Sequence, residues 1–148
     1  MSEFSIEEFL TASEEQQIIN AIRIAEKQTS GEIRVHIEPS SKGDIENRVL
    51  EVFTILKMHN TEQHNAVLFY VAVEDKSFAI YGDEGIDAVV PKVFWNSTKD
   101  LVEQHFKKGD FTTGLIAGIN EAGKQLKSYF PWQSDDNNEL PNSISKSE

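Results

Sequence analysis

The sequence contains one segment whose residue types could hold a metal ion, residues 82–87 (Gly-Asp-Glu-Gly-Ile-Asp). Three acids fall within this segment, so their like charges repel one another and a nearby cation would relieve the repulsion. Its two glycines let the backbone turn where a β-carbon would clash. Carboxylate oxygens on a loop are the ligands that Ca²⁺ and Mg²⁺ prefer. The alternative is a helix start whose acids face the positive helix end, and because such starts are common the segment alone favours that interpretation.

Three predicted strands surround this segment. Residues 32–38 alternate polar and apolar side chains, which predicts a strand with one buried face. Residues 66–73 are continuously apolar, as is typical of a central strand covered on both faces. Residues 77–81 return after a polar turn as an antiparallel partner. The metal-binding segment therefore begins where the third strand ends.

The remaining segments show helical spacing. Thr11 and Glu14 fit a capping box for a helix that ends near residue 30. Asp44 is a plausible cap for a second helix, and Asp110 for a last helix that Pro131 stops. Between them we expect one turn at 86–90 and a helix at 91–108 with Pro91 in its first position. The last helix contains three glycines, which we expect to let it approach the sheet closely: Gly114, Gly118 and Gly123.

The order of these elements predicts the fold class. A strand–helix–strand unit implies a parallel pair with a right-handed crossover, to which the hairpin adds an antiparallel strand. Four helices suffice to cover both faces of such a small mixed sheet. We therefore expect an α/β protein, a three-layer α/β/α sandwich spanning residues 1–132, followed by a disordered acidic C-terminal tail at residues 133–148.

Strand direction brings separated residues to one edge of this sheet. The first two strands start there and the third ends there, so loops from three parts of the chain meet. Oxygen donors dominate the set, which favours Ca²⁺ or Mg²⁺ over a transition metal. With this convergence, the cation-site and helix-start interpretations of residues 82–87 are equally well supported. The predicted metal ligands are Glu32, His64, Asn65, Asp83, Glu84 and Asp87.

Composition excludes several other functions. The chain has 148 residues, a net charge of −11 and no cysteine. The charge disfavours nucleic acid and anionic membranes as partners, and the lack of cysteine excludes disulfides and thiolate metal sites. The acidic first residues do not resemble a signal peptide, and no segment approaches a membrane span. We therefore expect a soluble, cytoplasmic monomer.

Four segments resemble the TPM domain family. Residues 29–35 (Thr-Ser-Gly-Glu-Ile-Arg-Val) look like its TG-x-E-I-x-V motif, and residues 65–71 are similar to its N-G-V-L-L-x-V strand. Residues 80–85 match its glycine-rich turn, and residues 106–115 resemble its F-x-x-G-x-[FY]-x-x-G-[LI] signature. Together the segments cover about residues 9–128 in the family's order and spacing.

The resemblance implies an α/β/α sandwich with a Ca²⁺ or Mg²⁺ site at the strand-edge loops. It also implies relatives that include a thylakoid-lumen acid phosphatase acting in photosystem II repair, and membrane-anchored proteins. This chain departs from the family at His64-Asn65-Ala66, where many members have Asp-Asn-Gly. We also expect it to have neither the signal peptide nor the membrane anchor that members usually have, which argues against their extracytoplasmic roles.

Two functions remain open. The first is a cation-dependent interaction or regulatory module whose loops are ordered by the ion and which binds a protein partner. The alternative is a metal-dependent phosphatase in which metal-bound water attacks a phosphate monoester, with Glu32 or Glu84 as ligand or base. The first is favoured because the predicted site contains no lysine or arginine to hold phosphate. No catalytic residue is assigned.

Overall fold

The computed structural model describes residues 10–132, 142 and 144–146 of the chain. Its strands form one mixed sheet in the order β3-β2-β1-β4. The strands are β1 (Glu32–Glu38), β2 (Ala66–Ala72), β3 (Ser77–Gly82) and β4 (Ser145–Lys146). The helices are α2 (Ala12–Glu26), α3 (Ile45–Ile55), α4 (Glu84–Asp87), α5 (Asn96–Lys107) and α6 (Phe111–Leu126).

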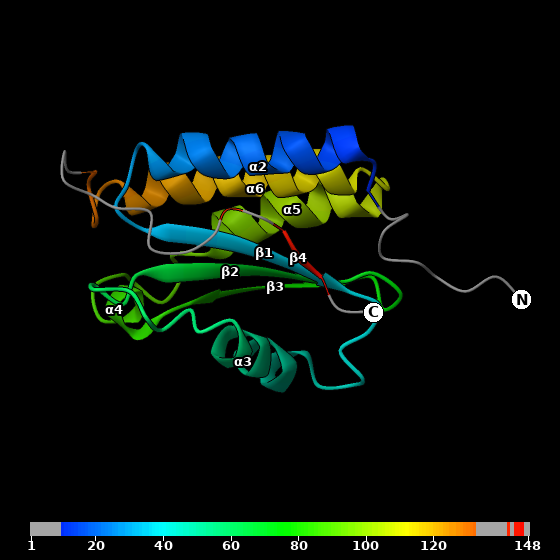
Figure 1. Ribbon diagram of the computed structural model, residues 1–148, viewed down its shortest axis with the longest axis horizontal. Coiled ribbons are helices and arrows are strands. Elements are labelled where there is room, and N and C mark those ends of the chain that lie inside the picture. Colours follow the sequence, from blue (N-terminus) through cyan, green and yellow to red (C-terminus); the bar gives the residue numbers. More distant parts are fainter. Residues whose placement is uncertain (1–9, 133–141, 143, 147–148) are drawn as a thin grey trace, which may run out of the picture.

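The sheet is covered on both faces. Helices α2, α5 and α6 lie on one face and α3 lies on the other, while α4 sits at one end (Figure 1). β1 pairs in parallel with β2, and β3 pairs antiparallel with β2. The α/β/α sandwich and the direction of its first three strands are thereby confirmed.

The prediction of one buried face for β1 is wrong. Glu32, His36 and Glu38, which the alternation assigned to solvent, are 3%, 3% and 2% exposed. Arg48 of α3 and Tyr70 of β2 cover Glu38, and Glu26 at the end of α2 lies beside Glu32. His36 stacks on Tyr70 of β2, with ring centroids 6.0 Å apart. Polar side chains of β1 are therefore enclosed rather than hydrated.

Helix starts follow the predicted caps more closely at some places than at others. The capping box is confirmed, since Thr11 and Glu14 exchange two hydrogen bonds of 3.0 Å. Asp44 caps α3 through the backbone N–H of Asn47 at 3.1 Å. The helix expected from residue 91 starts only at Asn96. Residues 91–95 form turns instead, because buried Phe94 packs edge-on against its neighbour Trp95 and against Tyr129.

Glycines let α6 approach its neighbours. A β-carbon on Gly118 would lie 2.5 Å from Val102 of α5 and 3.1 Å from Phe69 of β2. One on Gly123 would lie 2.8 Å from the β-carbon of Ala25 in α2. The expected approach to the sheet therefore holds at Gly118, whereas the closest contacts of both glycines are with helices.

The C-terminal segment includes a short strand. Ser145 and Lys146 form β4, which pairs in parallel with the second half of β1. Ile144 packs against the main core, and Lys146 forms an ion pair with Glu15 of α2. These residues form a strand where the sequence predicts disorder, because the open edge of β1 offers backbone groups that a strand can pair with. Most of residues 133–148 lie outside the described residues.

A chain that ends at Trp132 is expected to melt about 3–8 °C below the full chain, whereas removal of a wholly disordered tail would leave the melting temperature unchanged. The truncation removes the β4 pairing, the hydrogen bond between Ser145 Oγ and His36 Nδ1 of 2.9 Å, and the ion pair with Glu15. Together these contacts contribute about 1–2 kcal/mol. Calorimetry at pH 7 measures the difference. A chain ending at residue 146 is the control and should melt like the full chain, whereas equal melting of all three would show that β4 contributes nothing.

Candidate functional site

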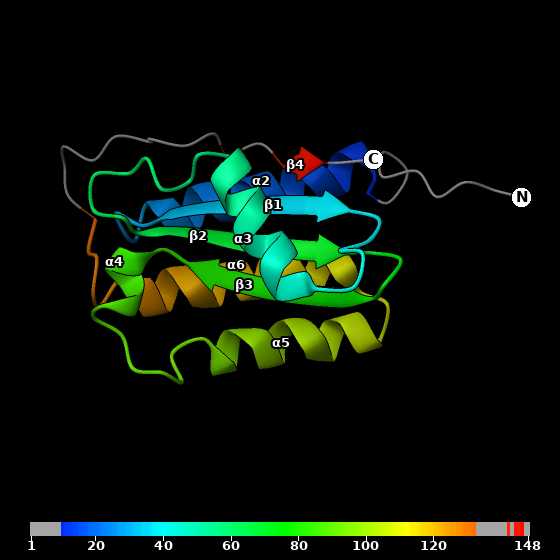
Figure 2. The ribbon, with the colours of Figure 1, turned by 90° about the horizontal axis from the view of Figure 1, so that it is seen from below.

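The predicted cation loops meet beside α4, at the sheet end where β2 begins and β3 ends (Figure 2). His64 Nδ1 lies 3.6 Å from Asp83 Oδ2 and 3.9 Å from Glu84 Oε1. His64 has a φ of 50°, so the loop turns sharply just before β2. Asp83 is 6% exposed, whereas the carboxylate of Glu84 is open to solvent. The structure thus brings together His64, Asp83 and Glu84 from two loops.

Gly85 permits this contact between the loops. Its N–H donates to the carbonyl of His64 at 2.9 Å. A β-carbon on Gly85 would lie 2.2 Å from the carbonyl oxygen of Gln63 and 2.5 Å from that of His64. Both distances are far inside van der Waals contact, so only glycine lets the first turn of α4 rest on the loop at 63–64.

Asp83 has two oxygens in different situations. Its Oδ1 accepts from the N–H of Glu84 at 2.8 Å, so Asp83 is the N-cap of α4 and the helix-start interpretation is correct for this atom. Its Oδ2 is buried and has no hydrogen-bond partner in the described part of the chain. The same is true of Asn65 Oδ1, although Asn65 Nδ2 donates to Ser30 Oγ at 3.4 Å. Buried oxygens without partners are costly, so these two atoms are available to a water molecule or a cation.

The other two predicted ligands lie further out. Asp87 is exposed on the surface. The loss of some of its hydration, and then the charge of Asp83, raise its pKa. Glu32 belongs to β1, which lies on the opposite side of β2 from Asp83, so about 10 Å of sheet separates their backbones. Among the described residues, no three histidine or acidic side chains are close enough to form a metal cluster by themselves. A cation here would need backbone or water oxygens as well.

The carboxylate of Glu32 has a neighbour that sequence reasoning missed. Glu26, the last residue of α2, shares a hydrogen bond with it and accepts from the N–H of Ile33 at 3.0 Å. Burial raises the pKa of Glu26 to about 8; the bond from Ile33 opposes this and the charge of Glu32 adds to it. The sequence signal was an acid at a helix end, six residues before another acid at a strand start. The raised pKa favours the protonated form of the Glu26 carboxyl at neutral pH.

Stability is expected to fall as pH rises from about 4.5 to 8 because of Glu26. Its pKa in the folded protein lies above its ordinary value, so in this range the folded state binds more protons than the unfolded state. Glu26→Gln keeps the neutral form and should flatten this slope, raising the free energy of unfolding at pH 9 by more than about 1 kcal/mol, the worth of one pKa unit. Urea unfolding at pH 5 and pH 9 measures both. An unchanged slope would show that Glu26 titrates normally.

A second polar cluster lies at the opposite end of β1. Arg48 of α3 donates to both oxygens of Glu38 at 2.7 Å, and Tyr70 and His36 also hydrogen-bond this carboxylate. Burial favours the neutral acid, but these hydrogen bonds outweigh it and lower the pKa of Glu38 to about 2. Ser145 of β4 completes the cluster through His36. All of Glu38's bonding capacity is used, so the cluster holds β1, β2, α3 and β4 together.

The sheet, the helices on its two faces and the acidic loop after β3 define the class of this protein. It is an α/β/α domain with an acidic loop at one end of its strands. Residues 5–125 match the family model of the TPM domain, and the chain belongs to this family. No curated protein matches the chain. In the part of the chain that the structure describes, no helix combines the length and the apolar character needed to cross a bilayer.

Three solved structures resemble the chain. BA42 from the psychrophilic bacterium Bizionia argentinensis sp. nov. is 57% identical and has a TM-score of 0.92, with 97% of this chain and 99% of BA42 covered. The N-terminal domain of a P. gingivalis protein is 18% identical, with a TM-score of 0.68 over 82% of this chain and 79% of that one. The N-terminal domain of cg2496 from Corynebacterium glutamicum is 15% identical, with a TM-score of 0.65 over 100% of this chain and 90% of that one. The last two show a shared fold alone.

Proposed function

We propose that this TPM domain binds Ca²⁺ or Mg²⁺ at the loops of residues 63–65 and 83–87 and acts as a cation-dependent interaction or regulatory module. The supporting observation is the buried Oδ2 of Asp83, which has no hydrogen-bond partner in the described residues and lies 3.6 Å from His64 Nδ1. A hard cation beside this oxygen would satisfy it and screen the neighbouring acids. Asp83 and Glu84 are the central ligands, with His64, Asn65 and Asp87 adjoining and Glu32 in an outer position.

The cation would link two loops, one of which carries three acids that repel one another. Asp83, Glu84 and Asp87 carry like charges within one helical turn, and the charges of all three act on Tyr81. An ion that neutralises them fixes α4 against the loop at 63–65, and its loss frees the two to separate. The surface around α4 would then differ between the cation-bound and cation-free states, and a protein partner in the cytoplasm could bind one state in preference to the other. We propose that the module works as a monomer.

Titration of the backbone amide signals with Ca²⁺, Mg²⁺ and Zn²⁺ tests the site. We expect Ca²⁺ or Mg²⁺ to shift residues 82–87 together with residues near 32 and 64–65. Ion binding to the folded state alone also adds about 2.7 kcal/mol to the free energy of unfolding at a hundredfold excess over Kd. Shifts confined to residues 135–148 would contradict the proposal, because they would reflect counterion attraction to the acidic tail.

Asp83→Asn with Glu84→Gln should abolish the cation-dependent gain in stability. Asparagine keeps the N-cap, so the double variant should also be more stable than the native chain without metal, because repulsion is removed. Glu103→Gln with Glu121→Gln makes the same charge change elsewhere and should preserve the gain. A double variant that still responds to Ca²⁺ would leave these acids as helix-start residues only. Hydrolysis of p-nitrophenyl phosphate with and without Mg²⁺, with Glu84→Ala as control, tests the phosphatase alternative.

A further inference from the structure

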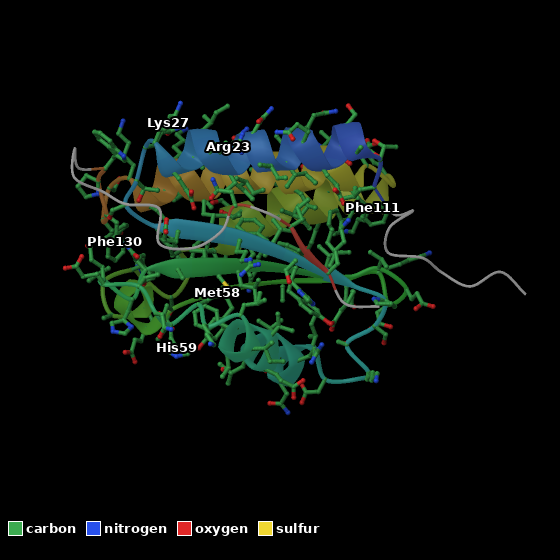
Figure 3. All side chains as sticks on the ribbon, in the orientation of Figure 1. Arg23, Lys27, Met58, His59, Phe111 and Phe130 are labelled. Carbon is green, nitrogen blue, oxygen red and sulfur yellow. The ribbon has the colours of Figure 1, made fainter. Side chains whose placement is uncertain are left out.

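The end of the molecule opposite α4 contains an apolar groove beside the open edge of β3. The groove has a volume of about 740 Å³. Phe111, which lines it, lies at the opposite end of the molecule from α4, as Figure 3 shows when compared with Figure 1 in the same orientation. The groove is therefore separate from the proposed cation site. The lining residues are Ile45, Lys76, Ser77, Phe78, Glu103, Phe106, Lys107, Gly109 and Phe111.

The backbone of β3 is available along this groove. β3 is the outermost strand on its side of the sheet. The N–H of Asp83 donates to Ala66 of β2, and the antiparallel register then turns Tyr81, Ala79 and Ser77 toward β2 as well. Alternate residues of an antiparallel pair direct their backbone groups away from the partner. Phe78 and Ile80 therefore present their N–H and C=O groups to the outside.

The groove has a hydrophobic wall next to this edge. Phe78 packs edge-on against Phe106 of α5, with centroids 5.6 Å apart, and Phe106 packs in the same way against Phe111 at 4.8 Å. All three rings are only partly buried. Ile45, at the start of α3, lines the groove from the other face of the sheet. An extended segment on the edge would thus find apolar surface for its side chains.

The charged residues of the groove indicate which kind of peptide segment could bind there. Lys76 and Lys107 line the groove against the single acid Glu103, in a chain whose net charge is −11. Lysines at a strand edge also oppose pairing with a second copy of the same edge, because like charges would meet. The same two lysines would attract an acidic segment at short range.

We propose that this groove binds an extended, acidic peptide segment of a partner protein, which adds to the sheet as a strand next to β3. Backbone hydrogen bonds to Phe78 and Ile80 supply affinity, as in other proteins that add a peptide strand to a sheet edge. Alternate apolar side chains of the peptide pack against Phe106 and Phe111, and its acids pair with Lys76 and Lys107.

Titration of the full chain with the acetylated, amidated pentapeptide Glu-Phe-Glu-Val-Glu tests the proposal. We expect saturable shifts of the amide signals of residues 76–80 and 106–111, and slower hydrogen exchange at Phe78 and Ile80. Lys76→Glu with Lys107→Glu should weaken binding by at least about tenfold. The same variant should keep the amide signals of residues 32–38 in place, which shows that it is folded.

Two control peptides separate the contribution of backbone pairing from that of the acidic side chains. Lys-Phe-Lys-Val-Lys should bind more weakly, and a Glu-Phe-Glu-Val-Glu peptide N-methylated on alternate amides should lose binding. Equal binding of the N-methylated peptide would overturn strand addition, and equal binding of the lysine peptide would overturn acidic selectivity. Absence of shifts at millimolar peptide, or shifts at the β1 edge, would overturn the site. Shifts of residues 76–80 that depend on protein concentration alone would assign the groove to a second copy instead.

Discussion

Replacing Arg48 with methionine is expected to lower the free energy of unfolding by about 3–5 kcal/mol. The variant leaves the carboxylate of Glu38, whose side chain is 3% exposed, without its two charged hydrogen bonds of 2.7 Å. The dependence of stability on low pH should also differ between the variant and the native protein. The pKa of Glu38 is about 2 in the native fold, so its contribution is present above about 4.5 and is lost as pH falls toward 2. In the variant this loss should shrink. Urea unfolding followed by tryptophan fluorescence between pH 2.5 and 7 measures both effects.

Two further variants identify the cause. Glu51 also pairs with Arg48 but its side chain is 62% exposed, so Glu51→Gln should cost less than about 1 kcal/mol. Combining Arg48→Met with Glu38→Leu removes the buried charge together with its partner and should recover much of the lost stability. If Arg48→Met costs no more than Glu51→Gln, the carboxylate of Glu38 is not held by Arg48.

Gly85→Ala is expected to destabilise the fold by about 3 kcal/mol, at the upper end of the usual cost of overpacking. The added methyl would meet the carbonyl oxygens of Gln63 and His64 at 2.2 and 2.5 Å. Backbone cannot yield as a flexible side chain can, so α4 must move off the loop at 63–64. The variant should therefore also weaken Ca²⁺ or Mg²⁺ binding by separating His64 from Asp83. Thermal unfolding and the amide titration measure the two effects.

Gly43→Ala is the matched control. Gly43 has a φ of 107° but open space where its β-carbon would be, so alanine there meets backbone strain without a clash. We expect a cost of about 1–2 kcal/mol and an unchanged cation response. Equal costs at both positions would show that the contact between the loops is not tight.

The fold was accessible from sequence because its strands differ in pattern. The unbroken apolar run at 66–73 marked the central strand, and the polar turn after it marked the antiparallel return. The capping box at Thr11 fixed the start of α2 to the residue, whereas the helix ends at Glu26, earlier than the predicted end near residue 30. The environment of the polar residues in β1 was not predicted correctly. Alternation indicates which side chains share a face, but it does not reveal that Tyr70 and Arg48 enclose that face. The β4 pairing was equally hidden, since two polar residues carry no strand signal.

Part of the candidate cation site could be predicted from the sequence, because the topology of the sheet determines which loops meet. Parallel and antiparallel directions place the loops before β2 and after β3 at one edge, and His64, Asp83 and Glu84 do meet there. Direction alone does not give lateral distance, so Glu32 was grouped with residues on the far side of β2. Its interaction with Glu26 depends on where α2 ends relative to the sheet, which only tertiary packing determines.

The packing of α2 beside α6 has a consequence for how the chain folds during synthesis. Thr112 near the start of α6 donates to Glu14 near the start of α2 at 2.7 Å, and Gly123 meets Ala25 near their ends, so α2 and α6 run in parallel. On the ribosome, α2 and one face of β1 emerge early but cannot be covered until α6 has left the exit tunnel. The main core should therefore close only after α6 has emerged, with α2 exposed to chaperones until then.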